Sequence, residues 1–258
     1  MNADVTSSAP NDANLDQDEV RRFADQAAEW WDPDGSFRPL HKIGPARITF
    51  IRDRLLQHFG MPSGGMRPLK GLSILDVGCG GGLICEPLCR LGATVTGIDP
   101  GQETVSAARS HAAQQGLDIE YCATTIEDLA EAGDSFDVVL ALEVLEHVPD
   151  PTGFVRTCGE LVRPGGAMIV STINRTAKSY ALAIVAAEYV LRWLPRGTHD
   201  WEKFLTLDQV RVALETAGLE DVMFDGISFN ALRDTWHLSS DTDVNFIAIA
   251  SKPSARAG

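Results

Sequence analysis

The chain has 258 residues and a formal net charge of −14, from 36 acidic and 22 basic residues. This length fits one α/β domain with additions, and 44% apolar residues can fill a core and exclude a disordered chain. The acidic balance argues against a nucleic-acid partner, because binding to a phosphate backbone requires clustered Lys and Arg. The five cysteines contain no C-x-x-C pair, and we expect them to be reduced thiols.

The N-terminal segment, residues 1–18, is polar and acidic, and we expect it to be a disordered tail. It has no apolar signal core, and no stretch of the chain is long and apolar enough to cross a bilayer. These features predict a cytoplasmic protein that could still touch the inner face of the membrane.

Two helices are expected next, at residues 20–31 and 45–59, separated by the turn sequence Asp32-Pro33-Asp34-Gly35. Residues 61–70 are rich in Gly and Pro and predict a linker. We therefore assign residues 19–70 to an N-terminal part that covers the cofactor site.

From residue 71 the sequence alternates between strand and helix patterns. The expected strands are 73–77, 94–98, 119–122, 136–140, 167–171, 219–224 and 245–250, and the expected helices are 83–91, 102–115 and 151–162. Pro164-Gly165-Gly166 is expected to form a turn. The alternation predicts a Rossmann-like α/β domain over residues 71–252, with a mostly parallel seven-stranded sheet and helices on both faces. We expect residues 253–258 to be a tail.

The run from Gly78 to Gly82 follows the first expected strand and predicts a nucleotide-type turn. A dinucleotide turn would require glycine at the position of Leu83. Asp76, just before the turn, would repel a pyrophosphate but suits a cation such as S-adenosylmethionine, which carries a sulfonium and an ammonium group. Gly78 and Gly80 would let the backbone approach this cofactor closely.

Two further positions complete the expected cofactor site. Asp99 ends the second strand, where a carboxylate can accept hydrogen bonds from both ribose hydroxyls. After the third strand, Ile126 would lie against the adenine ring, with Glu127 or Asp128 near its exocyclic amine. The alternative for these acids is an ordinary solvated loop.

These motifs resemble those of the class I S-adenosylmethionine-dependent methyltransferases. The matching segments are Asp76 to Gly82, Gly97 to Asp99, Asp137 to Val139 and Leu161 to Gly166. They identify a large superfamily and leave the methyl acceptor open.

Four other blocks resemble the ubiquinone biosynthesis O-methyltransferases, over about residues 20–252. They are Trp30 to His41, Glu143 to Pro151, Thr172 to Arg175 and Gly197 to Phe204. The resemblance implies that Arg47 reaches the methionine carboxylate of the cofactor and that Leu142 packs beside it. This family often has Met where Leu142 stands, and Leu preserves the side-chain volume.

The resemblance also implies a polyprenylated phenol or quinol as substrate and a divalent cation, Mg²⁺, as a second cofactor. Glu143, Glu146 and His147 would share one face if the chain turns helical after the fourth strand, and could hold this cation. Without a metal, His147 could act as the general base. The alternative is that the three residues cap a helix or form hydrogen bonds, as in metal-free relatives.

Residues 174–196 combine Arg175, Lys178, Arg192 and Arg196 with many apolar and aromatic residues. This composition fits an interfacial helix on anionic lipid that admits a prenyl tail, within an inserted segment at about 174–204. An ordinary lid helix is the alternative. Other enzymes of ubiquinone biosynthesis are further expected partners.

Three other functions remain open at this stage. They are a methyltransferase with a soluble acceptor, a non-catalytic cofactor-binding protein at a lipid surface, and a dinucleotide oxidoreductase. Leu83 and Asp76 argue against the oxidoreductase, and the Trp30 to His41 and Gly197 to Phe204 blocks favour the ubiquinone family.

Overall fold

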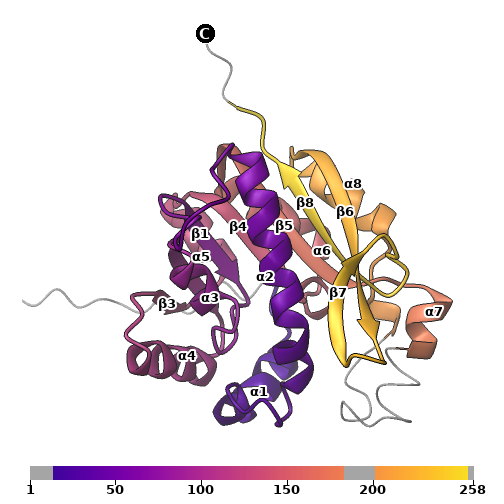
Figure 1. Cartoon of the computed structure of the whole chain (residues 1–258), viewed down its shortest axis with the longest axis horizontal. Helices are drawn as coiled ribbons and strands as arrows, with labels where there is room; N and C mark the ends of the chain where they lie inside the picture. Colours follow the sequence, from indigo (N-terminus) through magenta and orange to yellow (C-terminus); the bar gives the residue numbers. More distant parts are fainter. Residues whose placement is uncertain (1–13, 183–200, 255–258) are drawn as a thin grey trace, which may run out of the picture.

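The computed structural model describes residues 14–182 and 201–254. Their strands form one eight-stranded sheet in the order β3-β2-β1-β4-β5-β8-β6-β7. The strands are β1 Ser73–Val77, β2 Thr94–Asp99, β3 Glu120–Ala123, β4 Phe136–Leu142, β5 Val162–Ile173, β6 Glu220–Asn230, β7 Thr235–Ser239 and β8 Asn245–Ser251. The pairings from β3 to β5 are parallel, and those involving β8, β6 and β7 are antiparallel (Figure 1).

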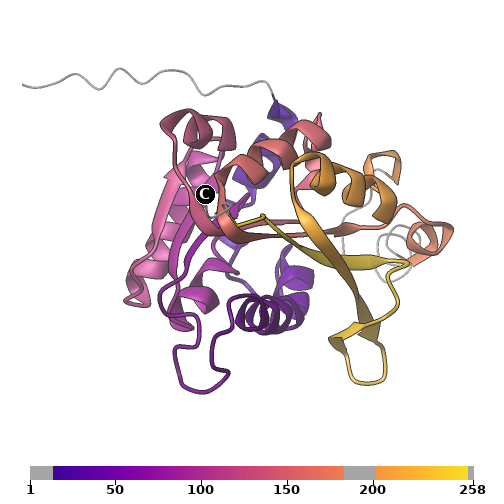
Figure 2. The same ribbon diagram turned by 90° about the horizontal axis from the view of Figure 1, so that it is seen from above.

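Helices cover both faces of the sheet (Figure 2). They are α1 Gln17–Asp25, α2 Arg38–His58, α3 Cys85–Arg90, α4 Gln102–Gln114, α5 Ile126–Ala132, α6 Pro151–Leu161, α7 Ala177–Ser179 and α8 Leu207–Thr216. Successive residues of a strand point to opposite faces, so Ile74 and Leu75 of β1 enter two separate cores. The first core contains side chains of α2, α3 and α4, and the second contains those of α6 and α8. The predicted Rossmann-like fold is confirmed.

The eighth strand, β7, is a difference from the seven strands expected. It pairs with the end of β6, which continues to Asn230 instead of ending at residue 224. The sequence of β7, Thr-Trp-His-Leu-Ser, has only two apolar residues. Its stability as a strand comes from pairing with β6, which the local pattern does not reveal.

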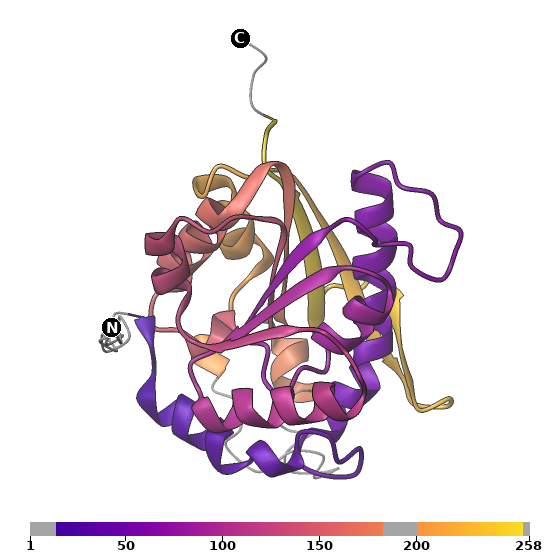
Figure 3. The ribbon, with the colours of Figure 1, turned by 90° about the vertical axis from the view of Figure 1, so that its left-hand side faces the viewer.

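The N-terminal helices also differ from the expected ranges. The predicted helix at 20–31 is α1 followed by a short 3-10 turn, Ala27–Glu29. This segment runs beside α4 (Figure 3). Helix α2 begins at Arg38 rather than residue 45, with Pro39 in its first turn and Pro45 inside it. The start was misplaced because Pro45 has the same sequence signature as a first-turn proline.

Two helices, α5 and α8, were not expected, although each has a recognisable start. Thr125 and Thr206 cap them, and each takes part in a reciprocal capping box with the residue three positions later. The expected turn at Pro164-Gly165-Gly166 is instead part of β5. Gly165 has a φ of +80°, and the register with β4 shifts nearby, so the strand accommodates the sequence as a bulge.

Candidate active site

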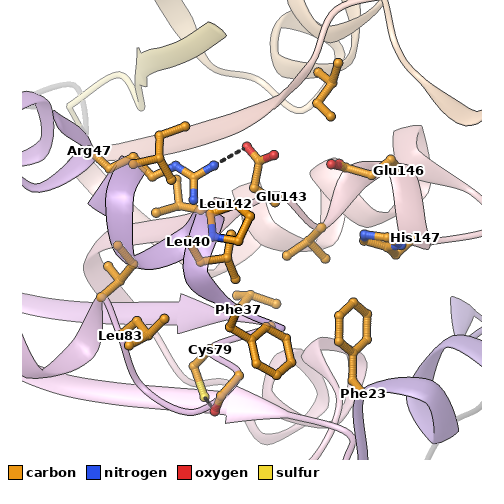
Figure 4. Close-up of a pocket in the computed structure, with 18 of the residues that line it drawn as sticks. Phe23, Phe37, Leu40, Arg47, Cys79, Leu83, Leu142, Glu143, Glu146 and His147 are labelled. Atoms are coloured by element: carbon orange, nitrogen blue, oxygen red, sulfur yellow. Dashed lines mark hydrogen bonds and ion pairs between the residues drawn. The ribbon is translucent and has the colours of Figure 1, made fainter. Parts of the chain in front are cut away.

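A cavity of about 1050 Å³ lies at the carboxyl ends of the parallel strands (Figure 4). Ligands of open α/β sheets bind at this edge. All ten residues that the sequence assigned to the site line it: Arg47, Asp76, Gly78, Gly80, Asp99, Ile126, Leu142, Glu143, Glu146 and His147. The structure therefore brings together residues from the N-terminal part and from three strand ends.

The glycine turn after β1 is shaped by a close approach of other groups. Gly78 and Gly80 have φ values of +68° and +54°, which glycine adopts without strain. A Cβ on Gly80 would lie 2.4 Å from the Trp30 ring, and one on Gly78 would lie 2.7 Å from Val144. Glycine at these two positions therefore leaves room for the Trp30 ring and the Val144 side chain, which a Cβ would displace.

Asp99 holds this turn from the end of β2. One carboxylate oxygen accepts a hydrogen bond from the Gly80 N–H at 3.2 Å, and the other accepts one from the Gly101 N–H at 2.9 Å. Burial raises the pKa of Asp99 to about 6, although these two hydrogen bonds lower it. Each oxygen retains a second lone pair for a ligand hydroxyl.

Asp76 is a buried carboxylate beside the same turn, with 3% of its surface exposed. Burial raises its pKa to about 7, and a 3.1 Å hydrogen bond from the Cys85 thiol only partly opposes this effect. A buried carboxylate with so little compensation is suited to a cationic ligand group.

Arg47 of α2 also lines the cavity, and only 4% of its surface is exposed. Its Nη2 lies 2.7 Å from Oε1 of Glu143. Its Nε is buried and has no hydrogen-bond partner within the described residues. This free donor fits a carboxylate, so Arg47, Asp76 and Asp99 together present the charges that S-adenosylmethionine would require.

The residues expected to form an adenine pocket lie directly after β3. Ile126 is buried at the start of α5 and lines the cavity, as does Glu127. Asp128 is instead part of the helix cap, because its carboxylate accepts hydrogen bonds from the Thr125 N–H and the Thr124 hydroxyl. Of the two acids, Glu127 is the one available to a ligand.

The two tryptophans before α2 anchor the N-terminal part on the glycine turn. Trp30 is buried and stacks on Phe37, with ring centroids 3.7 Å apart. Trp31 donates a 2.9 Å hydrogen bond to the Gly81 carbonyl and stacks on His111. These contacts anchor the N-terminal part on the glycine turn, and Trp30 also lines the cavity.

The common helical face expected for Glu143, Glu146 and His147 is wrong. Glu143 has a φ of +56°, which lies outside any right-handed helix, and only Leu145–His147 form a short 3-10 turn. Since Glu143 turns away from the helical path, the i, i+3, i+4 relationship does not apply. Figure 4 shows Glu143 turned towards Arg47, whereas Glu146 and His147 lie apart from this pair.

Each of these side chains has its own local partner. Glu143 accepts a 2.8 Å hydrogen bond from Ser171, in addition to its contact with Arg47. Glu146 accepts one of 2.8 Å from Thr172, and burial together with the nearby Glu143 raises the pKa of Glu146 to about 7.

His147 forms a contact with the first helix that the sequence did not predict. Its Nδ1 lies 3.2 Å from Oε2 of Glu19, and Phe23 packs edge-on against its ring. Burial alone would lower the pKa of His147, but Glu19 and Glu146 raise it above its usual value. No sequence motif marked Glu19, because the contact joins residues 128 positions apart along the chain.

These pairings bear on the expected Mg²⁺ site. Within the described part of the chain, no three His, Cys, Asp or Glu side chains come together in a way that could hold a metal ion. The donor set of Glu143, Glu146 and His147 does not fit a metal in this arrangement, because each side chain is directed to a protein group.

The expected membrane segment, residues 174–196, is described only as far as Leu182. Tyr180 and Leu182 are each 49% exposed. Lys178 pairs with Asp241 and Asp243, while Arg175 donates to Gln209. Arg192 and Arg196 lie outside the described residues, and no described helix is long and apolar enough to span a membrane.

A methyltransferase-domain family model matches residues 75–170. The ubiquinone biosynthesis O-methyltransferase of Parvibaculum lavamentivorans is 51% identical over 240 residues, which cover 93% of this chain and 95% of that protein. That of Sinorhizobium medicae is 54% identical over 239 residues, 93% and 96% of the two chains.

Solved structures confirm the fold at lower identity. The plantazolicin methyltransferase, in complex with S-adenosylhomocysteine, is 18% identical, with a TM-score of 0.61 over 92% of this chain and all of that one. The magnesium protoporphyrin IX methyltransferase of Synechocystis is also 18% identical, with a TM-score of 0.59 over 91% and 93%. The chain is therefore an S-adenosylmethionine-dependent methyltransferase and belongs to the ubiquinone biosynthesis O-methyltransferase family.

Proposed function

We propose that the chain methylates a ring hydroxyl of polyprenylated catechol and phenol intermediates of ubiquinone biosynthesis, including demethylubiquinol and a polyprenyl-hydroxyphenol. One observation carries this proposal. The cavity that contains the glycine turn and Asp99 also contains Glu143, Glu146 and His147. A cofactor and a phenolic acceptor could therefore meet in a single cavity. The names of the curated relatives support the same reaction.

The reaction needs alignment and the loss of one proton. S-adenosylmethionine supplies a methyl group that its sulfonium already activates. The phenol oxygen forms a bond to the methyl carbon, the bond from that carbon to sulfur breaks, and the sulfur keeps the electron pair. A phenol has a pKa of about 10, so a base is needed at neutral pH.

His147 is the proposed base for this proton. The Glu19 carboxylate lies 3.2 Å from its Nδ1, and Nε2 would accept the hydroxyl proton. Arg47 would orient the cofactor through its free Nε, while Asp76 and Asp99 would bind its ammonium and ribose groups. The aromatic cover formed by Trp30 and Phe37 would exclude water from the site.

The expected assistance by Mg²⁺ has no step in this proposal, because the donor residues do not fit a metal in the arrangement described. The assay should still test it with purified protein, in the presence of EDTA or added Mg²⁺ and with Glu143→Gln. Unchanged transfer in all cases would rule out a metal at this position. A loss with EDTA that Mg²⁺ restores would show that the side chains regroup.

The decisive assay uses a short-prenyl catechol and the matching monophenol as acceptors, with S-adenosylmethionine as donor. We expect methylation of a ring hydroxyl and stoichiometric S-adenosylhomocysteine. Activity on neither acceptor would contradict the proposal and favour a methyltransferase with another soluble substrate. His147→Ala should reduce kcat by about 100-fold, within the usual range for loss of a general base.

We also propose that the enzyme works in the cytoplasm, against the inner face of an anionic membrane, through residues 174–196, and near other enzymes of the same pathway. The support is the composition of that segment and the exposure of Tyr180 and Leu182. Liposome flotation tests it. Binding that is absent, or unaffected by charge reversal of Arg192 and Arg196, would contradict the proposal.

A further inference from the structure

The cavity extends beyond the residues that face the cofactor and the reacting hydroxyl. Its volume of about 1050 Å³ is above the 300–1000 Å³ that is usual for one drug-sized ligand. The additional lining includes Ile173, Ile227, Phe229, Trp236 and Val244. All five lie outside residues 75–170, the part shared with the general methyltransferase domain. The cavity therefore extends beyond the segment that the family model matches.

The hairpin of β6 and β7 provides most of this apolar lining. Phe229 lies directly opposite Trp236, and Ile227 lies opposite Leu238. Because side chains alternate between the faces of a strand, these four apolar residues share one face. The rings of Phe229 and Trp236 are 5.3 Å apart. We call Ile227, Phe229 and Trp236, which all line the cavity, the hairpin wall.

The other face of the same hairpin is polar. Ser228 lies opposite His237, and Asn230 lies opposite Thr235. Ser228 also lines the cavity, so the polar face borders it at this position. The hairpin is therefore amphipathic, and Trp236 also packs against the core on the side of α2. An apolar face that is partly exposed to a cavity is suited to an apolar ligand.

The charged side chains around this end of the cavity have partners. Asp234, in the hairpin turn, pairs with Lys42 of α2 at 2.5 Å. Lys178 pairs with Asp241 at 2.5 Å and lies 3.4 Å from Asp243. Each of these charged side chains is therefore paired with an opposite charge, and the pairs do not require a polar ligand group beside the hairpin wall.

The apolar lining also reaches the surface of the protein. Leu182 lines the cavity and is 49% exposed. At the hairpin turn, Ala231 lines the cavity, and its neighbour Leu232 is 98% exposed. Apolar side chains at the edge of the cavity are therefore exposed at Leu182 and beside Ala231, where a long apolar chain could leave it.

We infer that the hairpin wall binds the first isoprene units of the acceptor's tail and thereby makes Ile227, Phe229 and Trp236 determinants of specificity for prenylated substrates. This inference rests on the proposed function, because it assumes an acceptor whose ring carries a prenyl chain. The occupant follows from the chemistry of the hairpin wall, which is apolar, and from the exposed Leu182 and Leu232 near it.

The test measures kcat/KM for phenolic acceptors that carry zero, one or three isoprene units. For the natural sequence, kcat/KM should rise with each addition. Phe229→Ser should remove tenfold or more of this gain for the three-unit acceptor, mainly through KM, and leave the acceptor without a tail unchanged. Phe229 is half-buried, so the substitution should be tolerated, and S-adenosylmethionine binding checks the fold.

Two matched controls separate this role from others. Met223 is on the same strand, but it is 44% exposed and does not line the cavity. Met223→Ser should therefore leave the dependence of kcat/KM on tail length unchanged. Leu232→Ser tests whether the exposed tip acts only through a membrane. Trp236→Phe, a conservative second variant, should retain most of the preference.

The inference is overturned if Phe229→Ser reduces kcat/KM equally for all acceptors, or if the dependence on tail length survives. If the natural sequence methylates no acceptor, the proposed function fails. Calorimetry with the prenylated and unprenylated phenols, in the presence of S-adenosylhomocysteine, then decides the inference separately. Tighter binding of the prenylated phenol that Phe229→Ser abolishes supports it, and equal binding of both phenols contradicts it.

Discussion

The two halves of the cavity are built in different ways. The half that we propose for the cofactor, the cofactor half, depends mainly on the segment from Asp76 to Asp99, in which a glycine turn and two strand ends are close in sequence. The half that we propose for the acceptor, the acceptor half, combines Glu19, His147 and the hairpin wall, which come from distant parts of the chain. A site that depends on backbone conformation is formed by residues close in sequence. A site that depends on side-chain contacts can combine residues that only the tertiary fold brings together.

The largest expected effect tests the backbone shape of the cofactor half. Gly80→Ala places a Cβ 2.4 Å from the Trp30 ring, at a φ of +54°. The left-handed conformation costs about 1–2 kcal/mol, and overpacking costs typically 1–3 kcal/mol more. We expect roughly a 100-fold loss of kcat/KM, since a displacement of about 1 Å can have that effect. Steady-state kinetics and thermal unfolding measure it.

The matched control for Gly80 is Gly116, which follows α4. It also has a positive φ, +65°, but a Cβ there would meet nothing within 4 Å. Gly116→Ala should therefore lower stability through backbone strain and leave kcat/KM nearly unchanged. Similar kinetic losses in both variants would mean that the contact with Trp30 has no special role.

The same contrast explains what the sequence could predict. The βαβ alternation, the glycine turn and Asp99 were predictable because periodicity and turn chemistry are local signals. Strand β7 was missed because its pairing with β6, not its composition, makes it a strand. The common face of Glu143, Glu146 and His147 was wrong because Glu143 adopts a left-handed φ, which is uncommon for a non-glycine residue.

The cavity itself was predictable in position but not in extent. All ten expected residues line it, since the carboxyl edge of a parallel sheet is a general location for ligands. The contacts of Glu19 and of the hairpin wall depend on tertiary packing between segments that share no motif. Their roles in binding and catalysis, and those of the ten residues, stay predictions for experiment.

An intermediate effect is expected where the two halves meet, at the 2.7 Å contact between Arg47 and Glu143. Arg47→Met should weaken binding of S-adenosylmethionine by about 10- to 100-fold, since a hydrogen bond to a charged group contributes roughly 1.5–3 kcal/mol. Glu143→Gln retains an oxygen that can accept hydrogen bonds from Arg47 and Ser171, and should change this affinity by less than about threefold. Isothermal titration calorimetry measures both. Equal losses would show that Glu143 belongs to cofactor binding and that the halves are not separable.

The smallest expected effect concerns the protonation of Asp76 in the cofactor half. Burial raises the pKa of Asp76 from 3.8 to about 7, so the folded state binds this proton more tightly than the unfolded state. The resulting contribution to stability is complete below about pH 3.8 and is lost as the pH rises towards 7. Asp76→Asn removes this dependence and should raise the melting temperature of the cofactor-free protein by a few degrees at pH 8.

Asp137 is the matched comparison for this effect, because its pKa is shifted in the opposite direction. Partial burial would raise that pKa, but hydrogen bonds from Ser73 and the charge of Arg163 lower it. Asp137→Asn should therefore reduce stability at pH 8, where Asp76→Asn increases it. Asp76→Asn should also reduce the stabilisation by S-adenosylmethionine, since the cation loses its carboxylate. If the melting temperature falls in both variants, the Asp76 carboxylate stabilises the folded protein. The proposal that its buried charge destabilises the cofactor-free protein would then be wrong.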